Sequence, residues 1–289
     1  MVLDIIISGL ISGSIYALLS IGFSLIYGIA RIVNLAHTAF FMVASYCIYQ
    51  ATHKLGFNPA FGMLTAVILV TLFGLISYKL FIDPIREHEA AVLIATIALA
   101  MAMQEVMLII FSGDYLSVPS LINGYLKILG VKVFYQQMLT FGAALLVMVV
   151  LWALLMKTRL GLAIRSTAED REVANLMGIN ESRVAMITMG ISVGLAAFAG
   201  AVIVPLTTLS PFMWMHPLIM MLAVVVLGGL GSIKGSFCGA YILGFAEALV
   251  VFLIPMGAFL KGSVALSIMI IVLLIRPEGL FGVSFEEER

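Results

Sequence analysis

Four ionisable side chains lie inside long apolar stretches of the sequence, where they could bind a charged group or relay a proton. They are Glu105, Glu247, His37 and His216. A titratable group in an apolar span is costly, so each is a functional hypothesis by default. A proton relay needs a chain of such groups, and four in 289 residues are few. Three interpretations stay open for the carboxylates: a direct functional role, pairing with a donor at a helix end, or a position near an interface.

The glycine-rich segment 227–239 could be mistaken for a nucleotide-binding loop. A P-loop needs Gly-Lys-Ser/Thr after a glycine and four residues, whereas here Lys234 precedes Gly235. Gly231, Gly235 and Gly239 instead recur every four residues, which lets two helices approach closely. Because the chain also contains no His-Glu-x-x-His and no Gly-x-Ser-x-Gly, the sequence predicts neither a catalytic residue nor an ATPase site.

Cysteine and charge usage exclude further kinds of site. Cys47 and Cys238 lie far apart in apolar segments and match no metal-ligand spacing, so we interpret them as small core residues. Fifteen basic and fifteen acidic side chains cancel, which leaves no excess of positive charge for nucleic-acid binding. The sequence predicts no metal, no cofactor and no nucleic-acid partner.

Composition identifies the environment in which these residues must be positioned. The chain is 63% hydrophobic and 10% charged, far from the roughly 25% charge of soluble domains. Its mean hydropathy is +1.20. The sequence therefore predicts an all-α polytopic membrane protein, with lipid as its surroundings.

Uncharged runs long enough to span a bilayer, about 20 residues each, divide the chain into eight or nine segments. A prediction of one domain over 1–289 is the simplest. Pro205, Pro211 and Pro217 interrupt the longest run and predict a broken or re-entrant helix there. Gly9 and Gly13 in the first segment have the spacing of a helix-packing pair. The expected segments are 5–30, 32–53, 55–78, 90–112, 133–156, 185–208, 217–233, 235–255 and 262–275.

Basic residues in short loops predict orientation, because they stay on the cytoplasmic side. The loop 157–184 holds five of the fifteen lysines and arginines and is expected to be cytoplasmic. Counting segments from it places the N-terminus outside and the tail 277–289 inside. Within the loop, Ser166 or Thr167 is a candidate N-cap and Gly178 a candidate stop for one short amphipathic helix. That helix either lies on lipid headgroups or docks into a cytoplasmic partner.

Several motifs occur together in one order along nearly the whole chain. They are Gly13-Ser-Ile-Tyr-Ala-Leu, Gly22-Phe-Ser-Leu-Ile-Tyr-Gly28, Val33-Asn-Leu-Ala-His37, the loop 165–180, the segment 227–235, and Arg276-Pro-Glu-Gly-Leu-Phe-Gly282. In these motifs the sequence resembles the LivH-type permeases of branched-chain amino-acid ABC importers. The resemblance implies the ABC importer permease fold in a prokaryotic inner membrane.

The resemblance also implies partners and site residues. Expected partners are a second homologous permease or a second copy of the chain, two cytoplasmic ATPase subunits, and an extracytoplasmic substrate-binding protein. The loop helix 166–180 would couple to the ATPase through Glu169, Asp170, Arg171, Asn175, Gly178 and Asn180. Charge-poor helix ends and broken backbone would line the translocation path at Asn34, His37, Thr38, Pro205 and Pro211.

One departure from the family pattern leaves the cargo open. The family commonly continues Ala-His with Gly-Glu or Gly-Asp, whereas this chain reads His37-Thr-Ala-Phe-Phe41 and has no acid there. Permeases for urea and short amides share the family. Two further classes stay open from the residues alone. An ion-gradient-driven secondary transporter would use Glu105 and Glu247, and a non-transporting membrane scaffold would show the same spans.

Overall fold

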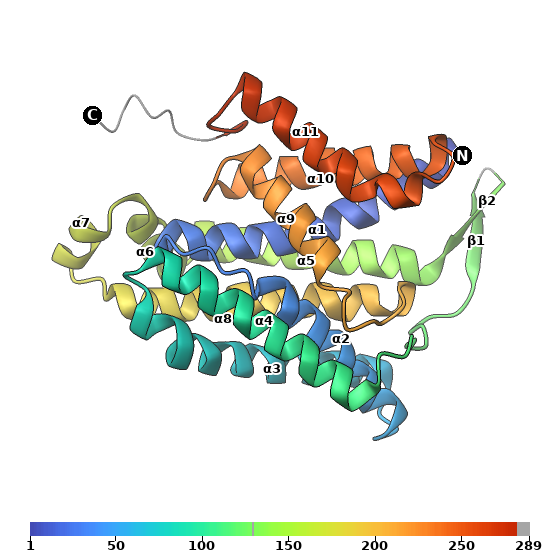
Figure 1. Cartoon of the computed structure of the whole chain (residues 1–289), viewed down its shortest axis with the longest axis horizontal. Helices are drawn as coiled ribbons and strands as arrows, with labels where there is room; N and C mark the ends of the chain where they lie inside the picture. Colours follow the sequence, from blue (N-terminus) through green and yellow to red (C-terminus); the bar gives the residue numbers. More distant parts are fainter. Residues whose placement is uncertain (129, 282–289) are drawn as a thin grey trace.

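The computed structural model describes residues 1–128 and 130–281, which form a bundle of long apolar helices (Figure 1). Within these residues, seven helices are long and apolar enough to cross a membrane, and the helices α2 and α9 are shorter. The helices are α1 (Val2–Ala30), α2 (His37–His53), α3 (Pro59–Ser77), α4 (Glu89–Phe111), α5 (Tyr135–Lys157), α6 (Arg159–Glu169), α7 (Arg171–Leu176), α8 (Glu181–Ile203), α9 (Met215–Gly228), α10 (Ile233–Leu253) and α11 (Lys261–Ile275). The predicted all-α polytopic membrane fold is confirmed.

Helix α1 lies at the centre of the bundle. It packs along α10 and also contacts α8, α9 and α5, while α8 contacts α2 and α3 on its other side. Small residues make the α1–α10 contact close, since a Cβ on Gly244 would lie 2.6 Å from the Cα of Gly13. Helices α3, α4 and α11 lie at the periphery and expose apolar side chains such as Ile109 and Leu274. In a bilayer those faces contact lipid rather than water.

The second helix begins later than its uncharged run predicts. Arg31 takes a left-handed backbone conformation with φ 54°, and α2 starts only at His37. The intervening residues form a connection, in which the Asn34 side-chain oxygen accepts a hydrogen bond from the Ala36 N–H at 3.1 Å. Asn34 therefore caps a turn and does not share a helical face with His37.

The long uncharged run breaks where its prolines predict. A short 3-10 turn, Val204–Leu206, follows α8, and the chain is then irregular until α9. Leu209 forms a two-hydrogen-bond bridge with Leu116 from the α4–β1 connection, which satisfies both backbone groups of Leu209 in this non-helical segment. At about 1.5 Å per residue, the 14 residues of α9 reach about 21 Å, short of the roughly 30 Å hydrocarbon core.

A β-hairpin and the short helices α6 and α7 occupy opposite ends of the bundle (Figure 1). Strands β1 (Tyr125–Ile128) and β2 (Val131–Phe134) pair antiparallel between α4 and α5. The N-terminus lies on the hairpin side. The end of α11 returns to the α7 side, where the Leu280 N–H donates to the Leu227 carbonyl at 2.8 Å. Of the predicted tail 277–289, residues 282–289 lie outside the described part of the chain.

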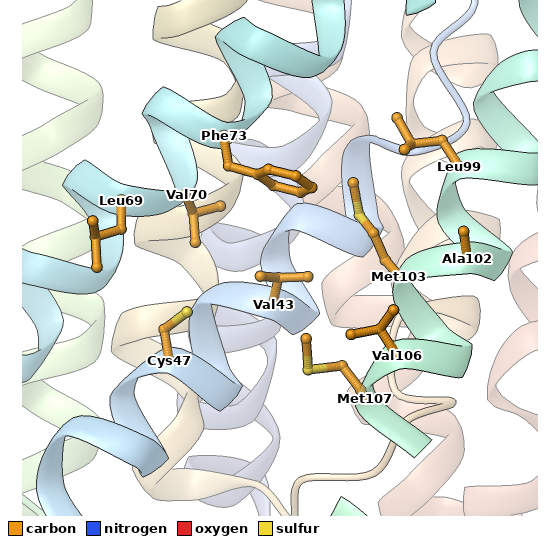
Figure 2. A pocket seen from close by; sticks show the side chains of 10 residues that line it. All are labelled: Val43, Cys47, Leu69, Val70, Phe73, Leu99, Ala102, Met103, Val106 and Met107. Carbon is orange, nitrogen blue, oxygen red and sulfur yellow. The ribbon is translucent and has the colours of Figure 1, made fainter. Parts of the chain in front are cut away.

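An apolar cavity of about 360 Å³ lies between α2, α3 and α4. Figure 2 shows side chains such as Val43, Phe73 and Met103 converging on it, together with Cys47. None of its ten lining side chains is charged. It suits a hydrocarbon chain better than a polar solute.

Candidate functional site

The predicted path residues of the second segment are buried deep in the bundle. Asn34, His37 and Thr38 have no exposed surface. The His37 ring packs beneath Gly22 of α1, and its Nδ1 lies 3.3 Å from the Ser192 hydroxyl of α8. His37 therefore contacts α1 through packing and α8 through a polar contact.

The predicted prolines lie elsewhere. Pro205 is part of the 3-10 turn after α8, and Pro211 lies in the irregular segment before α9. Val204, which begins the 3-10 turn, lies twelve positions after Ser192, the residue that contacts His37, or about 18 Å along the helix axis. The structure therefore does not bring the two predicted sets of path residues together, and their roles stay predictions.

The loop expected to form one helix over 166–180 forms two, α6 and α7, so that expectation is wrong. Thr158 caps α6, which makes Ser166 and Thr167 interior residues. The break falls at Asp170, whose side-chain oxygen accepts from the Val173 N–H at 3.0 Å and caps α7. Cap residues favour a new helix start over continuation, because their side chains compete for backbone donors.

Polar contacts close the α7–α8 connection. Gly178 ends α7 with φ 86°, and Asn180 caps α8 by accepting from the Arg183 N–H at 2.9 Å. The Asn175 side chain bonds both the backbone N–H and the carboxylate of Glu181, at 3.4 and 3.5 Å. Together these bonds hold the connection between Asn175 and Arg183 in one arrangement.

Arg171 links α7 to the start of α8. Its Nη1 lies 3.6 Å from Glu181 Oε1. Partial burial lowers the pKa of the Arg171 guanidinium and the nearby Glu181 carboxylate raises it, while Arg31 and Arg86 add further lowering. Glu181 was not predicted as a site residue, although an acid next to an N-cap is a recognisable signal. Glu169, which was predicted, is exposed on the last turn of α6.

The tip of α7 is unusually apolar for an exposed helix. Leu176 is 86% exposed and Met177 79% exposed, and Val173 lies beside them. Ala174 faces inward and is buried. Large apolar side chains grouped at an exposed tip indicate a contact with another molecule.

A second polar cluster lies inside the bundle near its hairpin end. Glu247 of α10 is 5% exposed and accepts a hydrogen bond from the Tyr16 hydroxyl of α1. Its other oxygen lies 2.9 Å from Lys261 Nζ at the start of α11. The His216 ring of α9 lies tilted against the Tyr16 ring, with 6.4 Å between the ring centroids. The sequence singled out Glu247 and His216, but Tyr16 and Lys261 carried no local signal because their partners are distant in sequence.

Glu105 has a different environment. It is exposed on α4 and accepts from the neighbouring Gln104 amide at 3.4 Å. Gln104 itself accepts from the Trp214 indole N–H at 2.9 Å and so ties α4 to α9. Within the described residues, no three His, Cys, Asp or Glu side chains gather as metal ligands.

The predicted packing glycines all lie at close contacts or special turns. A Cβ on Gly9 would enter the Phe245 ring, and one on Gly13 would lie 2.7 Å from the Tyr241 ring. Gly235 packs against the backbone of Gly228, and a Cβ on Gly239 would lie 2.9 Å from the Val224 carbonyl. Gly231 has more space but adopts φ 81°, a conformation that favours glycine.

Comparison with known proteins identifies the family. The model of the branched-chain amino acid transport system permease component matches residues 5–274. The chain belongs to this permease family. The permease is 32% identical to the high-affinity branched-chain amino acid transport system permease protein BraD of Pseudomonas aeruginosa, over 96% of this chain and 94% of that protein.

Other relatives have similar coverage. The permease is 30% identical to LivH of Escherichia coli over 95% of this chain and 94% of that protein. It is 28% identical to a probable LivH of Methanocaldococcus jannaschii, over 96% and 92% of the two chains. Among solved structures, PsaBC from Streptococcus pneumoniae in complex with Fab matches with a TM-score of 0.52 at 14% identity, over 94% of this chain and 91% of that one. That likeness concerns the fold alone.

Proposed function

We propose that the permease is the membrane subunit of an ATP-driven importer for branched-chain or related amino acids, in a prokaryotic inner membrane. Its transport-system relatives support this cargo class. The importer would combine it with a second permease subunit or a second copy, two cytoplasmic ATPase subunits and an extracytoplasmic binding protein. ATP would bind in the partner subunits, since this chain contains no P-loop sequence.

The observation that carries this proposal is the exposed apolar tip of α7 on a loop held by internal hydrogen bonds. Leu176 and Met177 offer two large side chains to a groove on the ATPase. Asp170, Asn175 and Asn180 hold the tip through caps and hydrogen bonds. Because α7 contacts α8 and α6 contacts both α1 and α8, movement of the tip would be passed to these two helices.

Charge distribution supports the proposed orientation. Ten of the fifteen basic residues lie at the α7 end and four at the hairpin end, while Arg289 lies outside the described residues. Short basic loops stay cytoplasmic. The α7 end would therefore face the ATPase, and the hairpin end would face the binding protein.

The assembly test replaces Leu176 and Met177 together by alanine and measures co-purification with the ATPase subunits. We expect about a tenfold or greater loss of association, because deeply buried anchor residues dominate interfaces. The matched control is Phe259→Ala, a side chain that is 83% exposed at the opposite end of the bundle. Normal association of the double variant would refute the docking role of α7.

The cargo test compares uptake of labelled leucine, urea and a short amide by cells carrying the complete importer. Leucine uptake that stops on ATP depletion and persists when ionophores collapse ion gradients supports the proposal. Uptake that follows the ion gradient instead would favour the secondary-transporter alternative. Preferential uptake of urea or amide would assign the permease to another cargo of the same family.

A further inference from the structure

A second cavity, of about 240 Å³, opens near the hairpin end of the bundle between α1, α5, α10 and α11. The 3-10 turn after α8 contributes part of its wall through Leu206. This is the place where prolines break the helix, and broken backbone at membrane depth is tolerated where it borders a cavity. Glu247 and Lys261 both line this cavity.

The charged pair has unused bonding capacity. Glu247 uses one oxygen toward Tyr16 and the other toward Lys261. A carboxylate offers about four acceptor sites and an ammonium three donors, so each group has room for a further partner. Ser8 and Ser12 of α1 line the same cavity and add hydroxyl groups near the charges.

Gln137 and Thr207 add two uncharged polar side chains to the wall, and its other lining residues are apolar. Ile11, Ile203, Leu206, Val251 and Phe252 surround the space beside the charged pair. The cavity therefore presents one positive group, one negative group, a few uncharged polar groups and a hydrocarbon surface to a single small ligand. The apolar cavity in Figure 2 has no charged side chain in its wall and lacks this combination.

We infer that the cavity at Glu247 and Lys261 binds a zwitterionic amino acid with an apolar side chain during transport. The ligand ammonium bonds the Glu247 carboxylate, the ligand carboxylate bonds Lys261, and its side chain packs against Ile203, Leu206 and Val251. The inference rests on the proposed function and specifies its cargo further. A neutral solute such as urea has no charges to match this pair, so its hydrogen bonds to the two ions are weaker than those of a zwitterion.

Substitutions distinguish an ion pair that only stabilises the fold from one that binds a ligand. Replacing both partners of a buried pair by apolar residues of similar size is often neutral for stability, whereas removing one partner leaves an unpaired buried charge. The informative variant is therefore the double substitution Glu247→Met with Lys261→Met. If the pair is only structural, the double variant should still transport leucine. If the pair binds the zwitterion, the double variant should lose transport.

The transport test reconstitutes the complete importer in liposomes and measures leucine uptake and ATP hydrolysis. For the double variant we expect uptake to fall about tenfold or more, as loss of charge-assisted bonds predicts, while assembly and basal ATP hydrolysis persist. Glu105→Gln is the matched control, because it removes another carboxylate from an apolar span outside this cavity. Uptake by the double variant within about twofold of the original would overturn the inference.

A binding test works even if leucine is not transported. Ser12→Cys, in a chain whose Cys47 and Cys238 are replaced by alanine, places a thiol at the cavity wall. Leucine should slow labelling of this thiol, while 4-methylpentanoate, 3-methylbutylamine and urea should not. No protection by leucine, or equal protection by these analogues, would refute the site. Protection without leucine uptake would instead refute the proposed function and leave the site standing.

Discussion

Asp170 shows how one side chain can set the direction of a segment. It stands after the last residue of α6 and before the first residue of α7, and its backbone N–H still bonds the Ser166 carbonyl. Its side chain meanwhile accepts from Val173. The residue therefore ends one helix and begins the next, which turns the apolar tip of α7 away from the bundle.

Replacing Asp170 by alanine should loosen α7 and weaken coupling to the ATPase. Loss of an N-cap costs about 1 kcal/mol, a large amount for a helix of six residues. We expect faster hydrogen exchange across 171–177 and a lower ratio of substrate uptake to ATP hydrolysis. Asp170→Asn is the control, since asparagine caps as well as aspartate. Equal exchange in the two variants would contradict this role.

Single residues differ in how far the sequence can predict their partners. Gly178 was expected to stop a helix, and it does so with φ 86°, because the cause is local. Glu247 could be singled out for its position in an apolar run, but Tyr16 lies 231 residues away. No local pattern reports such a contact. Lys261 looked like an ordinary charge between two spans until the fold placed it beside Glu247.

At the scale of elements, the close packing of α1 against α10 depends on glycines, which have no side chain. Gly244→Ala would push a Cβ into the backbone of Gly13, whereas a Cβ on Gly142 of α5 meets no atom within 4 Å. We expect Gly244→Ala to destabilise the permease by roughly 1–3 kcal/mol and to lower its melting temperature in detergent. Gly142→Ala, the matched control, should leave the melting temperature unchanged or raise it slightly. Similar melting of both variants would show that the close contact contributes little.

Long apolar helices were predictable because hydrophobic length alone specifies them in a bilayer. Short elements were not. The hairpin was missed even though Tyr125–Ile128 and Val131–Phe134 flank Gly130, which adopts φ 84° as a turn glycine does. The strands are brief, and a cross-strand contact of the Lys132 ammonium over the Tyr125 ring, at 4.9 Å, helps to hold them. Likewise, the point at which α6 ends and α7 begins depends on which of several potential capping side chains bonds the backbone N–H groups.

For the whole molecule, orientation is the testable property. In a chain whose Cys47 and Cys238 are replaced by alanine, Lys127→Cys on β1 should react with an impermeant maleimide in intact cells. Arg165→Cys on α6 should react only after the membrane is opened, because positive loops stay inside. The two positions are both exposed, which makes their labelling comparable. The reverse pattern would place the α7 end outside and contradict the proposed docking of an ATPase.

The pair between Glu247 and Lys261 has a consequence for how the permease is made. Helix α11 follows α10 in the chain, and few of its residues are buried against the other helices. A nascent chain that has not yet delivered Lys261 holds the Glu247 carboxylate in the bilayer without its cation, which is costly. Insertion of α11 removes that cost. A chain that stops before α11 would keep this carboxylate without its ammonium partner.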